Sequence, residues 1–169
     1  MKFADSWKNS IKMEGLSKTS KVKSQKRKNS DEHYVIDLCD EVLGKLASRQ
    51  HCFDFLRGDA SKVFPQGKKL PVDAYYDILN LVVEYYERQH TESVKHFNKQ
   101  NTVSGVTRDE QRRIYDERRR KILPEHGIDL IILSYTDFRC NPTKRLVRDR
   151  NSDIVVVRQK LKKYIDAQP

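Results

Sequence analysis

Residues 70–90, LPVDAYYDILNLVVEYYERQH, contain two apolar, strand-like segments with one unexpected acidic residue in each. The second segment, residues 79–86, is rich in Leu, Val and Tyr on both faces, which is typical of a strand covered on both sides of a sheet. An ionised carboxylate buried in such a strand costs on the order of several kcal/mol unless a cation or hydrogen-bond donors meet it. Glu84, and Asp73 in the first segment, therefore require partners.

The geometry of a hairpin between the two segments decides whether these acids meet. With a two-residue turn at residues 77–78, Asp73 faces Val82, and Glu84 is a diagonal neighbour on the same face, roughly 7–8 Å away between backbones. A four-residue turn over residues 76–79 keeps this register, whereas a three-residue loop would put the acids on opposite faces. Two carboxylates on one face at that spacing can reach one metal ion.

Several residues of this stretch also fall, without a gap, on a known pattern. They are Val72, Asp73, Leu79, Leu81, Glu84, Gln89 and His90. In these positions the chain resembles the PD-(D/E)XK nuclease superfamily, in its very-short-patch-repair-like (Vsr-like) branch, and the resemblance extends more weakly over residues 31–138. The sequence departs from the pattern at Tyr86, where the superfamily often has Lys and this branch often has Asp, and at Glu87, where the branch has Gly.

The resemblance implies an endonuclease that hydrolyses DNA with Mg²⁺ or Mn²⁺. Phosphodiester hydrolysis needs an activated water and neutralised phosphate oxygens, which a carboxylate-bound Mg²⁺ supplies, with Asp73 and Glu84 as its ligands. In this branch the residue matching His90 serves in place of, or beside, the missing Lys, so His90 would take a proton from the attacking water or orient it. Gln89 would position a phosphate or a water. Glu41 would match the acid near the first helix that many relatives aim at the metal, although an exposed helix Glu is the more common explanation of such a residue.

Hydrophobic periodicity predicts an α/β domain with a mixed central sheet, in the order α-β-β-β-α-β. The predicted segments are a helix over residues 31–48, strands over 50–57, 70–76 and 79–86, a helix over 107–123 and a strand over 128–134. About forty residues containing a helix separate the last two strands, which is the connection that a parallel pair requires. This order is also the restriction-endonuclease-like core order that the resemblance implies.

The helix over residues 107–123 begins with the capping box Thr107 to Glu110 and should stop before Pro124. Ile114 and Tyr115 are expected to face inward. The remaining surface of this helix is strongly basic, but acidic residues are interleaved with the basic ones. The pattern is compatible with a solvent-exposed face of salt bridges and with a surface that faces DNA.

The excess positive charge of the chain is concentrated at one end. The net charge is +10, and residues 1–30 carry nine Lys or Arg against two acids, a net of +7. We expect DNA as the partner, since a basic balance favours nucleic acid first and an anionic membrane second. The expected nucleic-acid contacts are Lys21, Lys23, Lys26, Arg27, Lys28, Arg112 and Arg119. The residues leave open whether the protein acts as a homodimer.

Three divisions of the 169 residues follow from these patterns. Residues 1–30 form a disordered basic tail, 31–138 the core domain, and 139–169 a basic loop followed by an amphipathic helix capped at Ser152. Three scattered cysteines without a CxxC pair suit a reducing compartment. With no long apolar run and no signal core, the sequence predicts a protein of the cytoplasm that does not enter a membrane.

Two other functions compete with the nuclease. The first is a catalytically inactive nucleic-acid-binding or interaction module on the same fold, for which Tyr86 and Glu87 are the motivation. The second is an RNA or mobile-element accessory protein that acts through its basic tail, which would require that removal of residues 1–30 lower nucleic-acid affinity.

Overall fold

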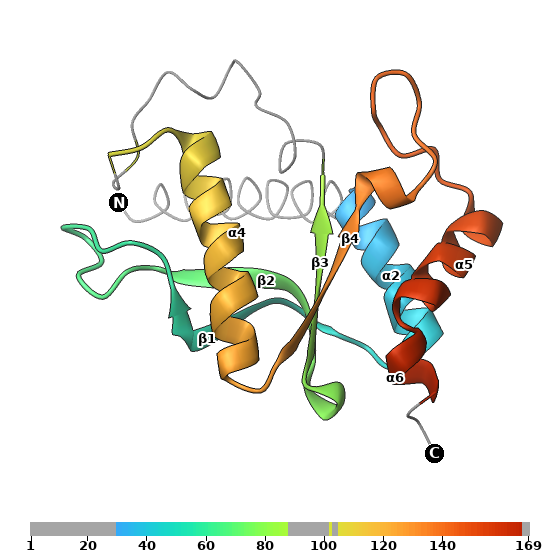
Figure 1. Ribbon diagram of the computed structural model, residues 1–169, viewed down its shortest axis with the longest axis horizontal. Helices are drawn as coiled ribbons and strands as arrows, with labels where there is room; N and C mark the ends of the chain where they lie inside the picture. Colours follow the sequence, from blue (N-terminus) through green and yellow to red (C-terminus); the bar gives the residue numbers. More distant parts are fainter. Residues whose placement is uncertain (1–29, 88–101, 103–104, 167–169) are drawn as a thin grey trace, which may run out of the picture.

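The computed structural model describes residues 30–87, 102 and 105–166 (Figure 1). Its helices and strands are α2 (Asp31–Leu43), β1 (Ser48–Arg57), β2 (Lys69–Tyr76), β3 (Leu81–Tyr86), α4 (Arg108–Glu125), β4 (Asp129–Ser134), α5 (Arg150–Lys160) and α6 (Lys162–Asp166). The four strands form one sheet in the order β1-β2-β3-β4, antiparallel except for the parallel pair β3 and β4. The α/β class and the mixed sheet are therefore confirmed.

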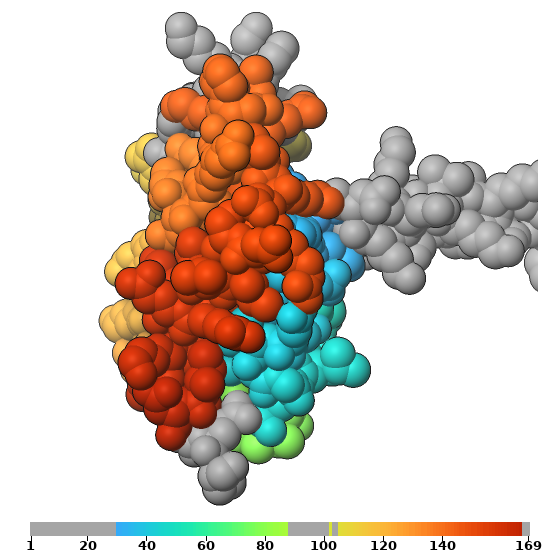
Figure 2. Space-filling view, turned by 90° about the vertical axis from the view of Figure 1, so that its right-hand side faces the viewer, coloured from blue at the N-terminus to red at the C-terminus, as the bar shows by residue number. Residues whose placement is uncertain are grey.

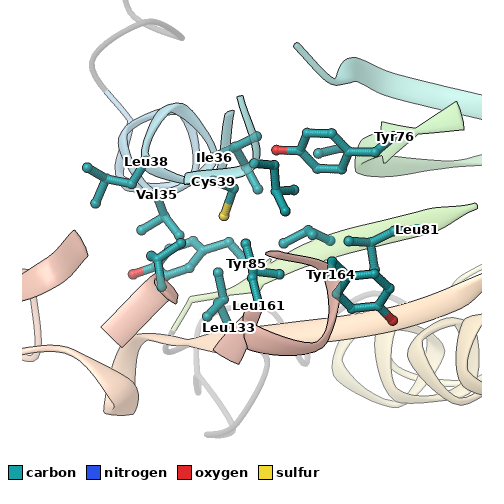
Figure 3. Close-up of a cluster of buried hydrophobic side chains, with 14 of the residues drawn as sticks. Val35, Ile36, Leu38, Cys39, Tyr76, Leu81, Tyr85, Leu133, Leu161 and Tyr164 are labelled. Carbon is teal, nitrogen blue, oxygen red and sulfur yellow. The ribbon is translucent and has the colours of Figure 1, made fainter. Parts of the chain in front are cut away.

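Two apolar cores lie on opposite faces of the sheet. The larger core packs α2, α5 and α6 against the face that carries Leu81, Val83 and Tyr85 (Figure 3). The smaller core lies under α4 and includes Val82 and Leu123. Because successive strand residues point to opposite faces, β3 contributes to both cores, and all six of its residues are buried as its composition predicted.

The first helix is shorter than predicted. Ser30 caps α2 by accepting a hydrogen bond from the backbone N–H of His33 (3.2 Å). The predicted end at residue 48 is wrong, because Gly44 adopts the left-handed conformation (φ 61°) that commonly follows a helix C-terminus. The chain then turns and enters β1 at Ser48, two residues before the predicted start of that strand.

The connection between β2 and β3 sets the register of the central hairpin. It consists of a 3₁₀ turn, Asp77–Leu79, and Asn80 in the left-handed conformation (φ 45°). The observed pairs are Tyr76 with Leu81, Tyr75 with Val82, and Ala74 with Val83. The predicted register, with Asp73 facing Val82, is wrong by two residues. The predicted loop between paired residues was 77–78, whereas the observed loop runs from Asp77 to Asn80. A shift of two keeps every side chain on its face, and the next pair in this register is Asp73 and Glu84.

The other two predicted helices also needed correction. α4 begins at the predicted Thr107 cap but continues to Glu125, with Pro124 inside its last turn. Ile114 is 36% exposed, so the expectation that it faces inward is wrong; Asp109, Asp116 and Leu123 are buried instead. α5 is capped by Asp149 instead of Ser152. None of the described helices is long and apolar enough to cross a membrane.

Candidate functional site

Asp73 and Glu84 lie opposite each other where β2 and β3 stop pairing. The paired ladder between these strands ends at Ala74 and Val83. Beyond that point each acid bonds the backbone of the other strand: the N–H of Asp73 donates to Glu84 Oε1 (3.2 Å), and the N–H of Tyr85 donates to Asp73 Oδ2 (2.9 Å). The hairpin therefore fixes both carboxylates between the two strands.

The surroundings of Glu84 disfavour its ionised form. Glu84 is 4% exposed. Burial, and then the neighbouring charge of Asp73, raise the pKa of Glu84 well above its ordinary value, with a further contribution in the same direction from Asp116. Arg119 and the N–H of Asp73 act in the opposite direction and offset only part of the effect. Burial at this position therefore favours the protonated, neutral form of Glu84.

Arg119 belongs to this site instead of to an open surface. Its side chain is 13% exposed and reaches from α4 toward the sheet. Nε lies 3.6 Å from Glu84 Oε1, while the terminal nitrogens contact Asp116 Oδ1 (3.1 Å) and the carbonyl oxygen of Pro71 (2.9 Å). The structure therefore places Arg119 as an internal counter-charge, contrary to the expectation that it lies on a DNA-facing surface.

Gln50 and Glu32 extend the site, and sequence reasoning missed both. The side-chain nitrogen of Gln50 lies 3.0 Å from Glu32 Oε1 and 3.4 Å from Asp73 Oδ1, so it joins the first turn of α2 to the acid pair. Gln50 also has a φ of 50° within β1. A non-glycine residue in this left-handed conformation is strained, and such strain often accompanies functional sites.

Glu41, in contrast, lies away from the acid pair. It is an exposed residue that forms an ion pair with Arg150 at the start of α5. Nine residues separate it from Glu32, which is two and a half helical turns, so the two side chains leave α2 on opposite sides. Of the two acids, Glu32 is therefore the one connected to Asp73, through the side chain of Gln50.

The remaining predicted site residues fall into two groups. Gln89 and His90 lie outside the described residues, as do the tail residues expected to bind nucleic acid: Lys21, Lys23, Lys26, Arg27 and Lys28. Arg112 is within the described part, on α4, where it lies 3.6 Å from the carboxylate of Asp109.

Tyr86 occupies the position where the superfamily often has Lys. Its ring is buried, and the guanidinium of Arg120 lies 5.5 Å from the ring centre. Burial, above all, raises the pKa of its hydroxyl, with Asp116 acting in the same direction. Tyr86 consequently stays protonated and supplies no positive charge beside Glu84.

The oxygen donors of this site suit a hard divalent cation. Mg²⁺ is commonly held by one or two carboxylates and retains several waters, so Asp73 and Glu84 are the residues that would hold such an ion. A larger set is not found: within residues 30–87, 102 and 105–166, no group of three or more His, Cys, Asp or Glu side chains could hold a metal.

Comparison with protein-family models, with curated proteins and with solved structures finds no match to this chain. The function therefore has to be inferred from the residues and their geometry.

Proposed function

We propose that the protein is a metal-dependent endonuclease that hydrolyses DNA phosphodiester bonds. The observation that carries the proposal is the pair Asp73 and Glu84, which lie on adjacent strands and each accept a hydrogen bond from the backbone of the other strand. The net charge of +10 and the resemblance of residues 72–90 to the Vsr-like nucleases add support.

Each residue of the site has a distinct role in this proposal. Asp73 and Glu84 would hold Mg²⁺ or Mn²⁺, which when bound neutralises phosphate oxygens and lowers the pKa of a bound water. Gln50 donates from its side-chain amide to Asp73 Oδ1 and to Glu32 Oε1, and would so help to hold the Asp73 carboxylate in place. His90 would accept the proton of the attacking water, and Gln89 would orient a phosphate, as the resemblance implies.

Arg119 gives Glu84 a counter-ion when no metal is bound. Its nitrogens also contact Asp116 and the carbonyl oxygen of Pro71, so the guanidinium keeps two partners if Glu84 turns to a metal ion. In the absence of metal, Arg119 thus partly neutralises the Glu84 carboxylate. On metal binding, Glu84 would exchange Arg119 for the metal ion, so that no further unpaired charge is buried.

Cleavage of supercoiled plasmid tests the proposal. We expect Mg²⁺- or Mn²⁺-dependent nicking or cutting by the wild-type protein, and its loss in Asp73→Asn and Glu84→Gln. Asp54→Asn is the matched control, because Asp54 is an exposed acid on β1 that pairs with Lys69. Cleavage by Asp73→Asn at the wild-type rate would refute the roles assigned here.

One observation favours a second candidate, a catalytically inactive nucleic-acid-binding module. Arg119 already lies against Glu84, and Tyr86 is buried and uncharged where relatives place a Lys. A folded protein that binds duplex DNA with an affinity indifferent to Mg²⁺, and that cuts none of several sequences, would favour this module over the nuclease.

A further inference from the structure

Residues 139–147 form a small, tightly bonded hairpin between β4 and α5. Cys140 and Leu146 form an antiparallel bridge, and the N–H of Val147 donates to the carbonyl oxygen of Arg139 (2.8 Å). At the tip, Asn141 Oδ1 accepts from the backbone N–H of Arg145 (2.9 Å) and from the hydroxyl of Thr143 (2.7 Å). The hairpin is therefore a defined structure with few free backbone groups at its turn.

The charge of this hairpin is of one sign. It contains Arg139, Lys144 and Arg145 and no acidic residue, and all three cationic residues are exposed. Lys144 stands in the left-handed conformation (φ 62°) that closes the turn. Arg139 and Arg145 form no ion pair with any residue in the described part of the chain, whereas on α4 Arg112, Arg118 and Arg120 pair with acids.

The base of the hairpin is fixed to the start of α2. Arg148 donates to Asp31 Oδ1 from two nitrogens (3.0 and 2.8 Å) and lies over the ring of Tyr34. Asp153, which is 1% exposed, accepts from the hydroxyl of Tyr34 (2.7 Å) and from the N–H of Asp149 (2.9 Å). The buried Asp153 thus connects the segment that follows the hairpin to α2.

These contacts connect the base of the hairpin to the first turn of α2, which is in turn bonded to Asp73 through Gln50. Asp31, which holds Arg148, is adjacent to Glu32, which is joined to Asp73 through Gln50. In Figures 1 and 2 the hairpin, in orange, projects at one end of the molecule, and the red helix α6 lies toward the other.

We propose that the basic hairpin, residues 139–147, grips the sugar–phosphate backbone of duplex DNA. This inference rests on the proposed function and deepens it, because it assigns the surface that holds the substrate. A hydrogen-bonded hairpin with three exposed cations and no acid matches a polyanionic backbone, and each phosphate contact would release counterions.

The test is binding of a fluorescent 20-base-pair duplex in EDTA, measured by anisotropy at several NaCl concentrations with the full-length chain. The test variant is Arg139→Gln/Arg145→Gln. The matched control, Arg158→Gln/Lys162→Gln, removes two exposed cations from α5 and α6. Arg139→Lys/Arg145→Lys keeps the charge, and thermal melting of every variant checks that it is folded.

We expect the hairpin variant to bind about tenfold or more weakly near 150 mM NaCl, since each phosphate contact contributes about 0.9 to the slope of log affinity against log salt. That slope should fall by about 1.8, with both other variants near wild type. Unchanged affinity and slope, an equal loss in the control variant, or no duplex binding by the wild type would overturn the inference. Because no metal is present, these results are independent of whether the protein cleaves plasmid.

Discussion

Replacing Glu84 by Gln tests the electrostatics of the acid pair through the pH dependence of stability. Burial and Asp73 raise the pKa of Glu84 from 4.5 to about 8 in the folded protein. Between these values the folded state binds a proton that the unfolded state has lost. The free energy of unfolding should therefore fall as the pH rises from about 4.5 to 8, by up to 1.36 kcal/mol per pH unit.

Over the whole window this slope amounts to at most roughly 4–5 kcal/mol, a large share of the 5–15 kcal/mol that holds a typical domain together. Glu84→Gln has no proton to lose, so its stability should change much less between pH 5 and 8.5. Urea denaturation of both proteins at several pH values measures the difference. Mg²⁺ should stabilise the wild type at pH 8.5 and should have little effect on Glu84→Gln.

Asp54→Asn is the control for this experiment. The pKa of Asp54 is lowered by its hydrogen bond and ion pair with Lys69, so the charge of Asp54 acts in the opposite direction and only in acid. Parallel pH profiles for the wild type and Glu84→Gln would refute the claim that burial raises the pKa of Glu84 in the folded protein.

Three further substitutions test individual contacts. Arg119→Met should destabilise the protein by about 3–5 kcal/mol at pH 8 and by less at pH 5, where Glu84 is protonated; an equal loss at both values in urea titrations would contradict its role as counter-ion. Gln50→Gly should relieve the positive φ, raising the melting temperature while weakening Mn²⁺ binding, and a lower melting temperature would show that no strain is stored there. Tyr34→Phe leaves the buried Asp153 one donor short and should lower the free energy of unfolding by about 1–3 kcal/mol; a loss below 0.5 kcal/mol would mean that the bond does not hold the hairpin base.

The pattern of buried strands and capped helices was readable from the sequence. Strand β3 could be predicted because Leu, Val and Tyr occupy both of its faces, and the Thr107 cap located the start of α4. The ends of the helices were harder to predict from the sequence. The left-handed Gly44 ended α2 early, while the continuation of α4 through Pro124 depended on tertiary packing that a local rule does not include.

The candidate site was predicted in part. Asp73 and Glu84 were singled out because a carboxylate in an apolar strand is unusual, and a register error of two residues still left them as neighbours across the hairpin. Gln50 gave no signal, since its importance comes from a backbone conformation and from two partners distant in sequence. Arg119 looked like one more cation of a basic helix, and only packing shows that it faces the sheet.

The most direct test of the account is the binding of Mn²⁺, followed by electron paramagnetic resonance of the free ion at pH 8, in wild type, Asp73→Asn and Asp54→Asn. The account predicts that the wild type and Asp54→Asn remove Mn²⁺ from solution at a site that Asp73→Asn has lost, and that excess Mg²⁺ displaces the ion. Equal uptake of Mn²⁺ by Asp73→Asn and the wild type would contradict the assignment of the Asp73 and Glu84 pair as the metal site.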